Sequence, residues 1–243
     1  MQSWGLTDPG NVRKQNQDAF RMEKLDHGAL LCVVCDGMGG AKSGNIASSL
    51  AAEVFVEEVR RVWKPLMDQE KIDQMLRSAA KLANFTVYDQ AAQFAEFDGM
   101  GTTLVAVFIK NRKATFINVG DSRAYGINQE GITQITKDHS LAQLMVDRGE
   151  LTSETSKSFP GKNYITRAIG TAPIILCDIF HRALRKGDFI HQCSDGLSNL
   201  MDAQEILFEV VHGVNKQQCC KRLLNIAKNR GAPDNVTSVL IMV

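Results

Sequence analysis

Five aspartates stand beside strand-like apolar runs or glycines, where carboxylates could do chemistry: Asp18, Asp36, Asp121, Asp195 and Asp234. Any one of them alone is more typical of a turn, because Asp hydrogen-bonds its own backbone and a neighbouring Gly accepts positive φ. Several at the ends of buried strands are harder to explain in this way, because a bare carboxylate at a core boundary is costly unless it is paired or bound to metal. Oxygen ligands without His or Cys suit Mg²⁺ or Mn²⁺ rather than zinc. The aspartates therefore predict a site for such ions.

The stretch Cys35-Asp36-Gly37-Met38-Gly39-Gly40 follows an apolar run at 29–34. We interpret Asp36 as the end of a buried strand and Gly37 as a residue whose bare backbone allows a carbonyl to approach an ion closely. Two ions roughly 3.5–4 Å apart would acidify a water for attack on phosphorus. Arg13, just upstream of Asp18, offers a bidentate fork for a phosphate, although an isolated arginine is more often a solvated surface side chain.

Hydrophobic periodicity predicts the elements that must position these residues. We expect strands at 3–7, 19–22, 29–35, 103–109, 114–119, 122–127, 132–135, 174–183, 188–193 and 237–243. We expect helices at 46–55, where Ser43 is the predicted N-cap, and at 72–97, 140–148, 203–211 and 216–229. Because strand clusters alternate with helix pairs, sheets covered by helices are favoured over a doubly wound parallel sheet.

Composition excludes several classes of protein. The chain has 243 residues without a repeat or a Pro/Gly-rich linker, which predicts a single domain. Its formal charge of +1, from 28 basic and 27 acidic residues, argues against a nucleic-acid binder with a broad basic face and against a polybasic membrane-surface protein. No apolar stretch approaches the roughly 20 residues that span a bilayer, and the N-terminus lacks the layout of a signal peptide. We therefore expect a cytoplasmic protein.

The six cysteines predict neither disulfides nor a zinc site. Cys32 and Cys35 have C-x-x-C spacing but lie in the apolar run, where residues three apart face opposite sides of a strand. A redox pair would instead lie at the start of a helix. We expect all six to be reduced and mostly buried.

Eight segments carry a resemblance to a known family, in the family's order and across nearly the whole chain: Gly10 to Asp18, Val34 to Gly40, Gly99 to Thr103, Asn118 to Tyr125, Lys137 to Ser140, Ile165 to Gly170, Ser194 to Gly196 and Asp234 to Thr237. With these motifs the sequence resembles the metal-dependent protein Ser/Thr phosphatases of the protein phosphatase 2C (PPM) type, the bacterial branch in particular. The resemblance implies an α+β fold, a four-layer α-β-β-α sandwich with two mainly antiparallel sheets packed face to face between helix pairs. It also implies a flap-like segment at about 149–163 within one domain, 1–243.

The resemblance further implies hydrolysis of phosphoserine and phosphothreonine on proteins by a metal-bridged hydroxide, without a covalent phospho-enzyme. The implied cofactors are two Mn²⁺ or Mg²⁺ ions and a third, weaker one. By this resemblance, Asp36 bridges two metals, Asp195 and Asp234 complete the first metal site, and the Gly37 carbonyl binds the second metal. Asp18 acts through metal-bound water, and Asp121 binds a third metal with Asp195. Arg13 binds the substrate phosphate. Implied partners are phosphorylated proteins and a cognate Ser/Thr kinase, and nothing requires more than a monomer.

Three positions leave the mechanism or the function open. Gln17 stands where many members carry Glu, so we expect weaker affinity at the second metal. Met38 occupies the place of a His proposed as general acid in the animal enzymes, and Met cannot donate a proton. His139 is a weak candidate for that donor, since a His before a helix is at least as often structural.

A phosphatase dedicated to one small regulator, such as an anti-sigma-factor antagonist, is an alternative. A pseudophosphatase that only binds is disfavoured, because Asp36, Asp195 and Asp234 are all present.

Overall fold

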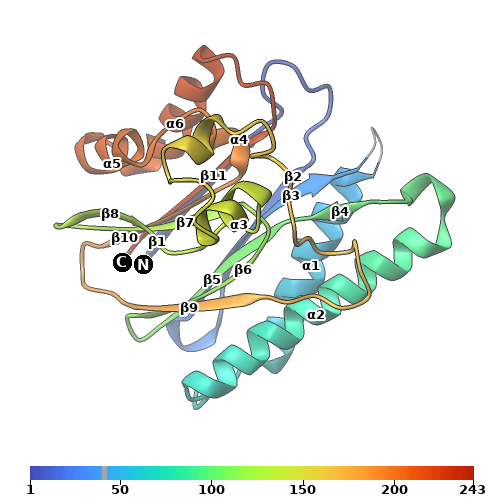
Figure 1. Cartoon of the computed structure of the whole chain (residues 1–243). Helices are drawn as coiled ribbons and strands as arrows, with labels where there is room; N and C mark the ends of the chain where they lie inside the picture. Colours follow the sequence, from blue (N-terminus) through green and yellow to red (C-terminus); the bar gives the residue numbers. More distant parts are fainter. Residues whose placement is uncertain (40–42) are drawn as a thin grey trace.

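Two antiparallel sheets pack face to face in the computed structural model, which describes residues 1–39 and 43–243 (Figure 1). The first sheet has the order β1 (Gln2–Asp8), β11 (Val236–Met242), β10 (Phe189–Cys193), β7 (Arg123–Asn128), β8 (Gly131–Gln134). The second has the order β2 (Asp18–Lys24), β3 (Leu30–Met38), β5 (Leu104–Lys110), β6 (Lys113–Val119), β9 (Asp178–Ala183), and the short β4 (Gly101–Thr102) pairs with the end of β3.

Helices cover the outer face of each sheet. The long pair α1 (Gly44–Val62) and α2 (Gln69–Gln93) packs on the second sheet (Figure 1). The first sheet is covered by α4 (Asp195–Ser198), α5 (Ala203–His212) and α6 (Cys219–Asn229). Three hydrophobic cores result, one under each helical layer and one between the sheets. The expected α-β-β-α sandwich is confirmed.

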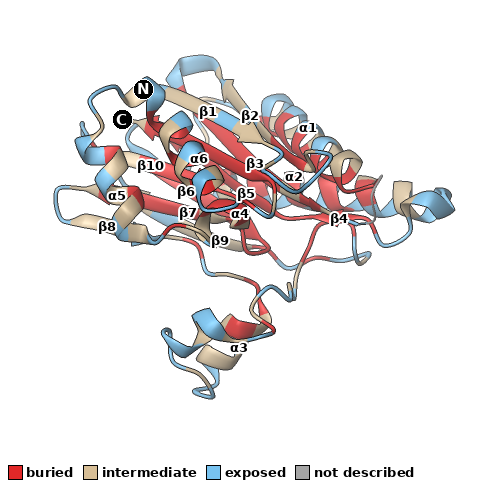
Figure 2. Ribbon diagram, turned by 90° about the horizontal axis from the view of Figure 1, so that it is seen from above, coloured by how far each residue is buried: buried red, intermediate tan, exposed pale blue. Residues whose placement is uncertain are grey.

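The remaining helices are short. Four are 3₁₀ turns, at Asp26–Gly28, Ala95–Phe97, Thr155–Ser158 and Lys216–Gln218. The segment that carries α3 (Leu141–Asp147) stands out from the body of the sandwich when the molecule is seen from above (Figure 2). No helix in the described part of the chain is both long enough and apolar enough to cross a membrane.

The alternation of side chains along β3 explains why this strand reads as a continuous apolar run. Cys32 contributes to the core between the sheets, whereas Cys35 contributes to the core under α1 and α2. Because both faces of the strand are covered, both need apolar side chains. All six cysteines are buried and free, as we expected from their positions.

Some predicted element boundaries are wrong. The strand expected from 174 begins only at Asp178, because hydrogen bonds from Asn84 to the carbonyls of Ala172 and Pro173, and from Arg77 to that of Cys177, hold the preceding segment along α2. The second long helix ends at Gln93 rather than 97. Ser43 does occupy the position before α1, but its side chain makes no capping hydrogen bond. Gly40, part of one motif, lies outside the described residues.

Candidate metal centre

Asp18 and Asp36 are directly paired residues of β2 and β3. Directly opposed residues project to the same face of a sheet, about 4.5–5.5 Å apart at Cβ, so the two carboxylates are neighbours. Asp36 does not end its strand, contrary to our expectation. The strand changes partner instead: Val34 is the last residue paired with β5, and Gly37 and Met38 pair with β4.

Two threonines hold the backbone of Asp36. Its N–H donates to Thr103 Oγ1 at 2.9 Å, and its carbonyl accepts from the Thr103 N–H and from Thr102 Oγ1, each at 2.9 Å. Both threonines are buried, so these bonds are shielded from water. These hydrogen bonds therefore fix the orientation of the Asp36 main chain at the site.

The carboxylate of Asp18 is oriented by two hydroxyls, one from Ser194 just after β10 and one from Thr237 of β11. Its Oδ2 accepts from Ser194 Oγ at 2.7 Å and from Thr237 Oγ1 at 2.6 Å. Its Oδ1 is buried and has no hydrogen-bond partner among the described residues. Ser194 directly precedes Asp195 and Thr237 closely follows Asp234, so these hydroxyls tie Asp18 to two more of the predicted ligands.

Asp195 and Asp234 are brought together by a close main-chain contact. A Cβ on Gly196 would lie only 1.9 Å from the carbonyl oxygen of Asn235, so α4 and the segment before β11 can meet only if this residue is glycine. Asn199 Nδ2 donates to Asp195 Oδ2 at 3.0 Å. Gly196 is thus a residue of the site that our sequence interpretation passed over, although the Asp-Gly dipeptide was visible.

Arg13 reaches the site through Asp234. Its Nη2 donates to Asp234 Oδ2 at 2.8 Å, and the two side chains are 53% and 40% exposed. The pair is therefore open to solvent at the rim of the carboxylate group. An exposed guanidinium at this place remains accessible to an anion that arrives from solution.

Asp121 lies in the turn between β6 and β7. Gly120 before it has φ of 107°, and a Cβ there would lie 2.6 Å from a side-chain carbon of Thr103, so only glycine suits this turn. The carboxylate of Asp121 is buried, and its Oδ1 has no hydrogen-bond partner in the part of the chain that the structure describes.

Mutual repulsion marks these carboxylates as one group. Burial, and then the charges of Asp18, Asp195 and Asp121, raise the pKa of Asp36 well above its ordinary value. Burial raises the pKa of Asp18 to about 7 against the lowering effect of its two hydroxyl bonds, and the charges of Asp195 and Asp234 raise it further. Burial and the charge of Asp195 raise the pKa of Asp121 to about 8, and burial and Asp234 raise that of Asp195.

The donor set fits hard divalent cations. All the candidate side-chain ligands are carboxylates, and buried oxygens of Asp18 and Asp121 find no hydrogen-bond partner among the residues that the structure describes. Within residues 1–39 and 43–243, no three His, Cys, Asp or Glu side chains are placed to hold an ion by themselves. Like charges keep such side chains apart, so a cation would have to draw them together, with main-chain oxygens or water completing its shell.

Gly37 has a packing role that the sequence did not reveal. Its N–H donates to the carbonyl of Gln17 at 3.1 Å, and a Cβ on Gly37 would lie 2.0 Å from the carbonyl oxygen of Gly44 and 2.5 Å from that of Gln17. The end of β3 can therefore pack against the start of α1 only without a side chain. The predicted role of its carbonyl as a metal ligand stays a prediction.

Comparison with known proteins identifies the family of the chain. The family model described as "Protein phosphatase 2C" matches residues 11–230. The chain belongs to the protein phosphatase 2C family. It is 34% identical over 97% of its length to a putative protein phosphatase 2C-type of Streptococcus pyogenes, covering 94% of that protein, and 30% identical over 97% to the serine/threonine phosphatase stp of Listeria monocytogenes, covering 93%. The crystal structure of the serine/threonine phosphatase Stp1 from Staphylococcus aureus superposes with a TM-score of 0.93 at 34% identity, over 99% of this chain and 94% of that one.

In this phosphatase, the ring of His139 is held by contacts within the protein. Its side chain is buried; Nδ1 accepts from the N–H of Gly120 at 3.1 Å, and Nε2 lies 3.2 Å from Asp178 Oδ2. Both ring nitrogens are engaged within the protein, which favours the structural alternative. Met38 pairs with Gly101 at the end of β3 and offers no proton either.

A cavity of about 630 Å³ adjoins the carboxylates of this phosphatase, and Asp121 and Asp195 lie in its wall. The segment 149–163, predicted as a flap, contributes five lining residues: Ser153, Ser156, Lys157, Lys162 and Asn163. Residues 198–203 and Glu205, around the start of α5, also line the cavity. The phosphatase therefore has room beside its carboxylates for more than a single phosphate group.

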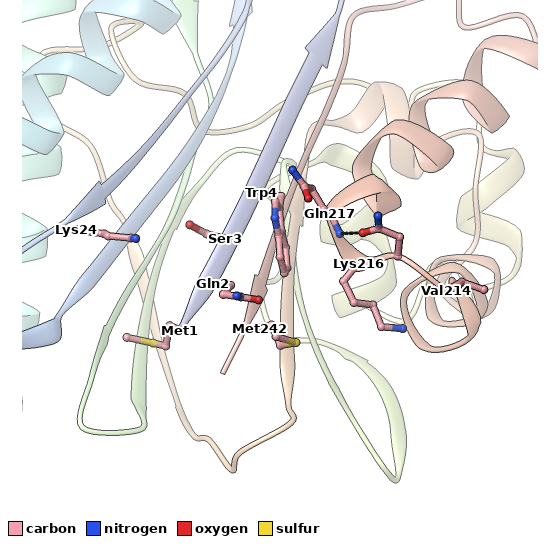
Figure 3. A pocket seen from close by; sticks show the side chains of 10 residues that line it. Met1, Gln2, Ser3, Trp4, Lys24, Val214, Lys216, Gln217 and Met242 are labelled. Carbon is pink, nitrogen blue, oxygen red and sulfur yellow. Dashed lines mark hydrogen bonds between the residues drawn. The ribbon is translucent and has the colours of Figure 1, made fainter.

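A second hollow, of about 640 Å³, lies at the other end of the sheets (Figure 3). Its lining comes from the start of β1, the ends of β2 and β11, and the loop after α5: Met1, Gln2, Ser3, Trp4, Lys24, Val214, Asn215, Lys216, Gln217 and Met242. None of the predicted site residues of the phosphatase lines it. The two hollows are therefore separate, and only the first adjoins the carboxylate group.

Proposed function

We propose that this member of the protein phosphatase 2C family hydrolyses phosphoserine and phosphothreonine on proteins, with Asp36 at the centre of a site for two Mn²⁺ or Mg²⁺ ions. The observation that carries the proposal is the direct pairing of Asp18 with Asp36 inside a group of carboxylates that raise one another's pKa. Such a group loses its repulsion when divalent cations bind. Membership of a family of protein phosphatases supports the choice of substrate.

We assign the ligands as Asp36 for both ions, Asp195 and Asp234 for the first, the Gly37 carbonyl for the second, and Asp121 with Asp195 for a third, weaker ion. Ions held there would supply a water of lowered pKa as the nucleophile. The protein's own part is orientation. Thr102 and Thr103 hold the backbone of Asp36, and the buried Oδ1 of Asp18, which has no hydrogen-bond partner among residues 1–39 and 43–243, would be available to a water held by the ions.

Arg13 is the proposed phosphate ligand. In its ion pair with Asp234, Arg13 donates from Nη2 to Asp234 Oδ2 at 2.8 Å, and the arginine side chain is half exposed. A guanidinium can bind a phosphate through two parallel N–H donors. Asp234 thus keeps Arg13 at the edge of the ligand group, where the phosphate of an incoming protein chain would meet it.

The experiment is hydrolysis of a phosphothreonine peptide by the full chain, titrated with Mn²⁺ and with Mg²⁺ and repeated in EDTA. We expect activity only with the added ion. Asp36→Asn should abolish it and keep the fold, as judged by circular dichroism. Asp188→Asn is the matched control, because the side chain of the buried Asp188 accepts a backbone N–H, from Arg185 at 2.8 Å, which an amide oxygen can accept as well. Near-normal turnover by Asp36→Asn, or full activity in EDTA, would contradict the proposal.

We further propose that the enzyme is cytoplasmic and monomeric, as one domain over 1–243 with 149–163 as its flap, and that it opposes a Ser/Thr kinase. The balanced charge and the relatives named as serine/threonine phosphatases support this setting. Sedimentation of the purified chain tests the monomer. Phosphoproteome comparison of cells with and without the phosphatase tests the kinase, because the sites that accumulate should be the sites that the kinase modifies.

A further inference from the structure

The peptide groups of Gly120 are held from both sides by one residue. The N–H of Gly120 donates to His139 Nδ1 at 3.1 Å, and the carbonyl of Gly120 accepts from the N–H of His139 at 2.9 Å. Asn118 Nδ2 also donates to this carbonyl, at 3.1 Å. Gly120 directly precedes Asp121, so the direction of the Asp121 side chain depends on how these peptide groups are oriented.

The hydrogen bonds determine the protonation of the His139 ring. Because Nδ1 accepts from the N–H of Gly120, the ring proton resides on Nε2, where it donates to Asp178 Oδ2 at 3.2 Å. Burial lowers the pKa of His139, and the charge of Arg167 lowers it further against the opposing effect of Asp178. The ring is therefore neutral at neutral pH, with a single tautomer.

Arg167 and Asp178 hold the far side of the ring. Arg167 Nη1 donates to Asp178 Oδ1 at 3.0 Å and lies 3.2 Å from His139 Nε2. Asp178 is the first residue of β9 and is paired with Asn118 of β6, so it is fixed by the sheet. Arg167 lies in the segment that follows the predicted flap.

That segment is joined to the chain around His139. The N–H of Thr166 donates to the carbonyl of His139 at 2.8 Å, and the N–H of Leu141 donates to the carbonyl of Tyr164 at 2.8 Å. The stem of residues 164–167 is thus connected through His139 to the turn that carries Asp121. None of these contacts requires a metal ion.

We propose that His139, held by Asp178 and Arg167, is a positioning residue that aims the buried carboxylate oxygen Oδ1 of Asp121 into the site, and that its loss weakens cation binding at Asp121. The inference rests on the proposed function for the ligand role of Asp121. Residues that orient metal ligands typically change metal affinity by about 10–100-fold when they are replaced.

Two amide substitutions separate the two sides of the ring. The amide oxygen of His139→Asn falls near the position of Nδ1 and can still accept from Gly120, whereas the amide of His139→Gln falls near Nε2 and leaves the Gly120 N–H without its acceptor. We expect His139→Gln to weaken the weakest Mn²⁺-binding step about 10-fold or more, and His139→Asn to weaken it less. His27→Asn is the control, because His27 is exposed and has φ of 57°, a conformation that Asn tolerates.

Binding is measured by the free Mn²⁺ signal in electron paramagnetic resonance, without substrate, with Asp121→Asn as the reference. Unchanged Mn²⁺ binding in His139→Gln beside weakened binding in Asp121→Asn would overturn the role of His139 alone. Unchanged Mn²⁺ binding in Asp121→Asn would instead show that Asp121 is not a metal ligand. It would then also contradict the proposed effect of His139 on cation binding. If His139→Gln does not fold, Asp178→Ala carries the test, since Asp178 is 39% exposed and alanine offers the ring Nε2–H no acceptor.

A second measurement is independent of metal. Nitrogen-15 NMR of the protein in EDTA should show His139 as the neutral Nε2–H tautomer, together with slow exchange of the Gly120 amide proton. A ring that is protonated on Nδ1, or a rapidly exchanging Gly120 amide, would contradict the hydrogen bond from Gly120 to His139 on which the proposal depends.

Discussion

Thr103 and Ser122 share a buried hydrogen bond of 2.7 Å between their hydroxyls. Thr103 Oγ1 also accepts from the N–H of Asp36, and Ser122 directly follows Asp121. One hydroxyl pair therefore connects the backbone of the central carboxylate with the turn of another. The two predicted ligands are held by the same small network.

The first prediction concerns this network. Thr103→Val keeps the shape of the side chain but removes the acceptor for the Asp36 N–H and leaves Ser122 without its partner. A buried donor without an acceptor costs about 1–3 kcal/mol, so we expect that loss in urea unfolding, together with weaker Mn²⁺ binding. Thr133→Val is the control, because Thr133 is exposed in β8 and should change stability by less than about 0.5 kcal/mol. Equal stability of the two variants would contradict the network.

The second prediction concerns Arg13. Arg13→Ala should mainly raise KM for a phosphopeptide, because the proposed contact with phosphate already forms in the bound substrate. Stability should change little, since the Arg13–Asp234 pair is open to solvent. Arg13→Lys keeps the charge without the bidentate fork, so its KM should lie between that of the unchanged protein and that of Arg13→Ala. A loss confined to kcat would mean that Arg13 acts in the transition state instead.

The third prediction concerns Gln17. The space that a Cβ on Gly44 would occupy is 2.7 Å from the side-chain carboxamide carbon of Gln17, so this side chain lies at the first residue of α1. A negative charge is favoured at the start of a helix, and it would add to the field that attracts a cation. Gln17→Glu should therefore lower the Mn²⁺ concentration for half-maximal activity. An unchanged metal titration would reject this idea.

The fourth prediction concerns pH. The pKa values of Asp18, at about 7, and Asp121, at about 8, lie above the ordinary value of 3.8, so the folded protein binds more protons than the unfolded chain across this window. The contribution of these groups to stability is thus present at low pH and is lost as pH rises through the folded pKa values. In EDTA, the free energy of unfolding should fall between about pH 5 and about pH 8, and Mn²⁺ should oppose the fall.

Urea unfolding at several pH values, with EDTA or with Mn²⁺, measures this effect. Asp18→Asn should flatten the dependence, because it removes one of the carboxylates whose pKa is raised. A metal-free protein whose stability is constant or rises over this range would show that the carboxylates do not repel one another as the structure indicates.

Several features follow from the sequence alone because they depend only on neighbours along the chain. The opposite facing of Cys32 and Cys35 follows from the two-residue period of a strand and was predicted correctly. The α+β class followed from the alternation of strand clusters with helix pairs, and the four-layer sandwich followed from the family motifs. The types of the five aspartates predicted oxygen ligation without any knowledge of distances.

Other features depend on pairing between distant segments, which the sequence does not encode locally. The register that sets Asp18 opposite Asp36, and the change of partner that carries β3 past Asp36, were decided by cross-strand hydrogen bonds. Gly37 and Gly196 appeared to be turn or ligand glycines, but each is required where another segment's backbone comes too close for a Cβ. His139 remained ambiguous until Gly120 and Asp178 were seen on its two ring nitrogens. Residue types thus determined the chemistry that is available, and tertiary contacts decided which atoms meet.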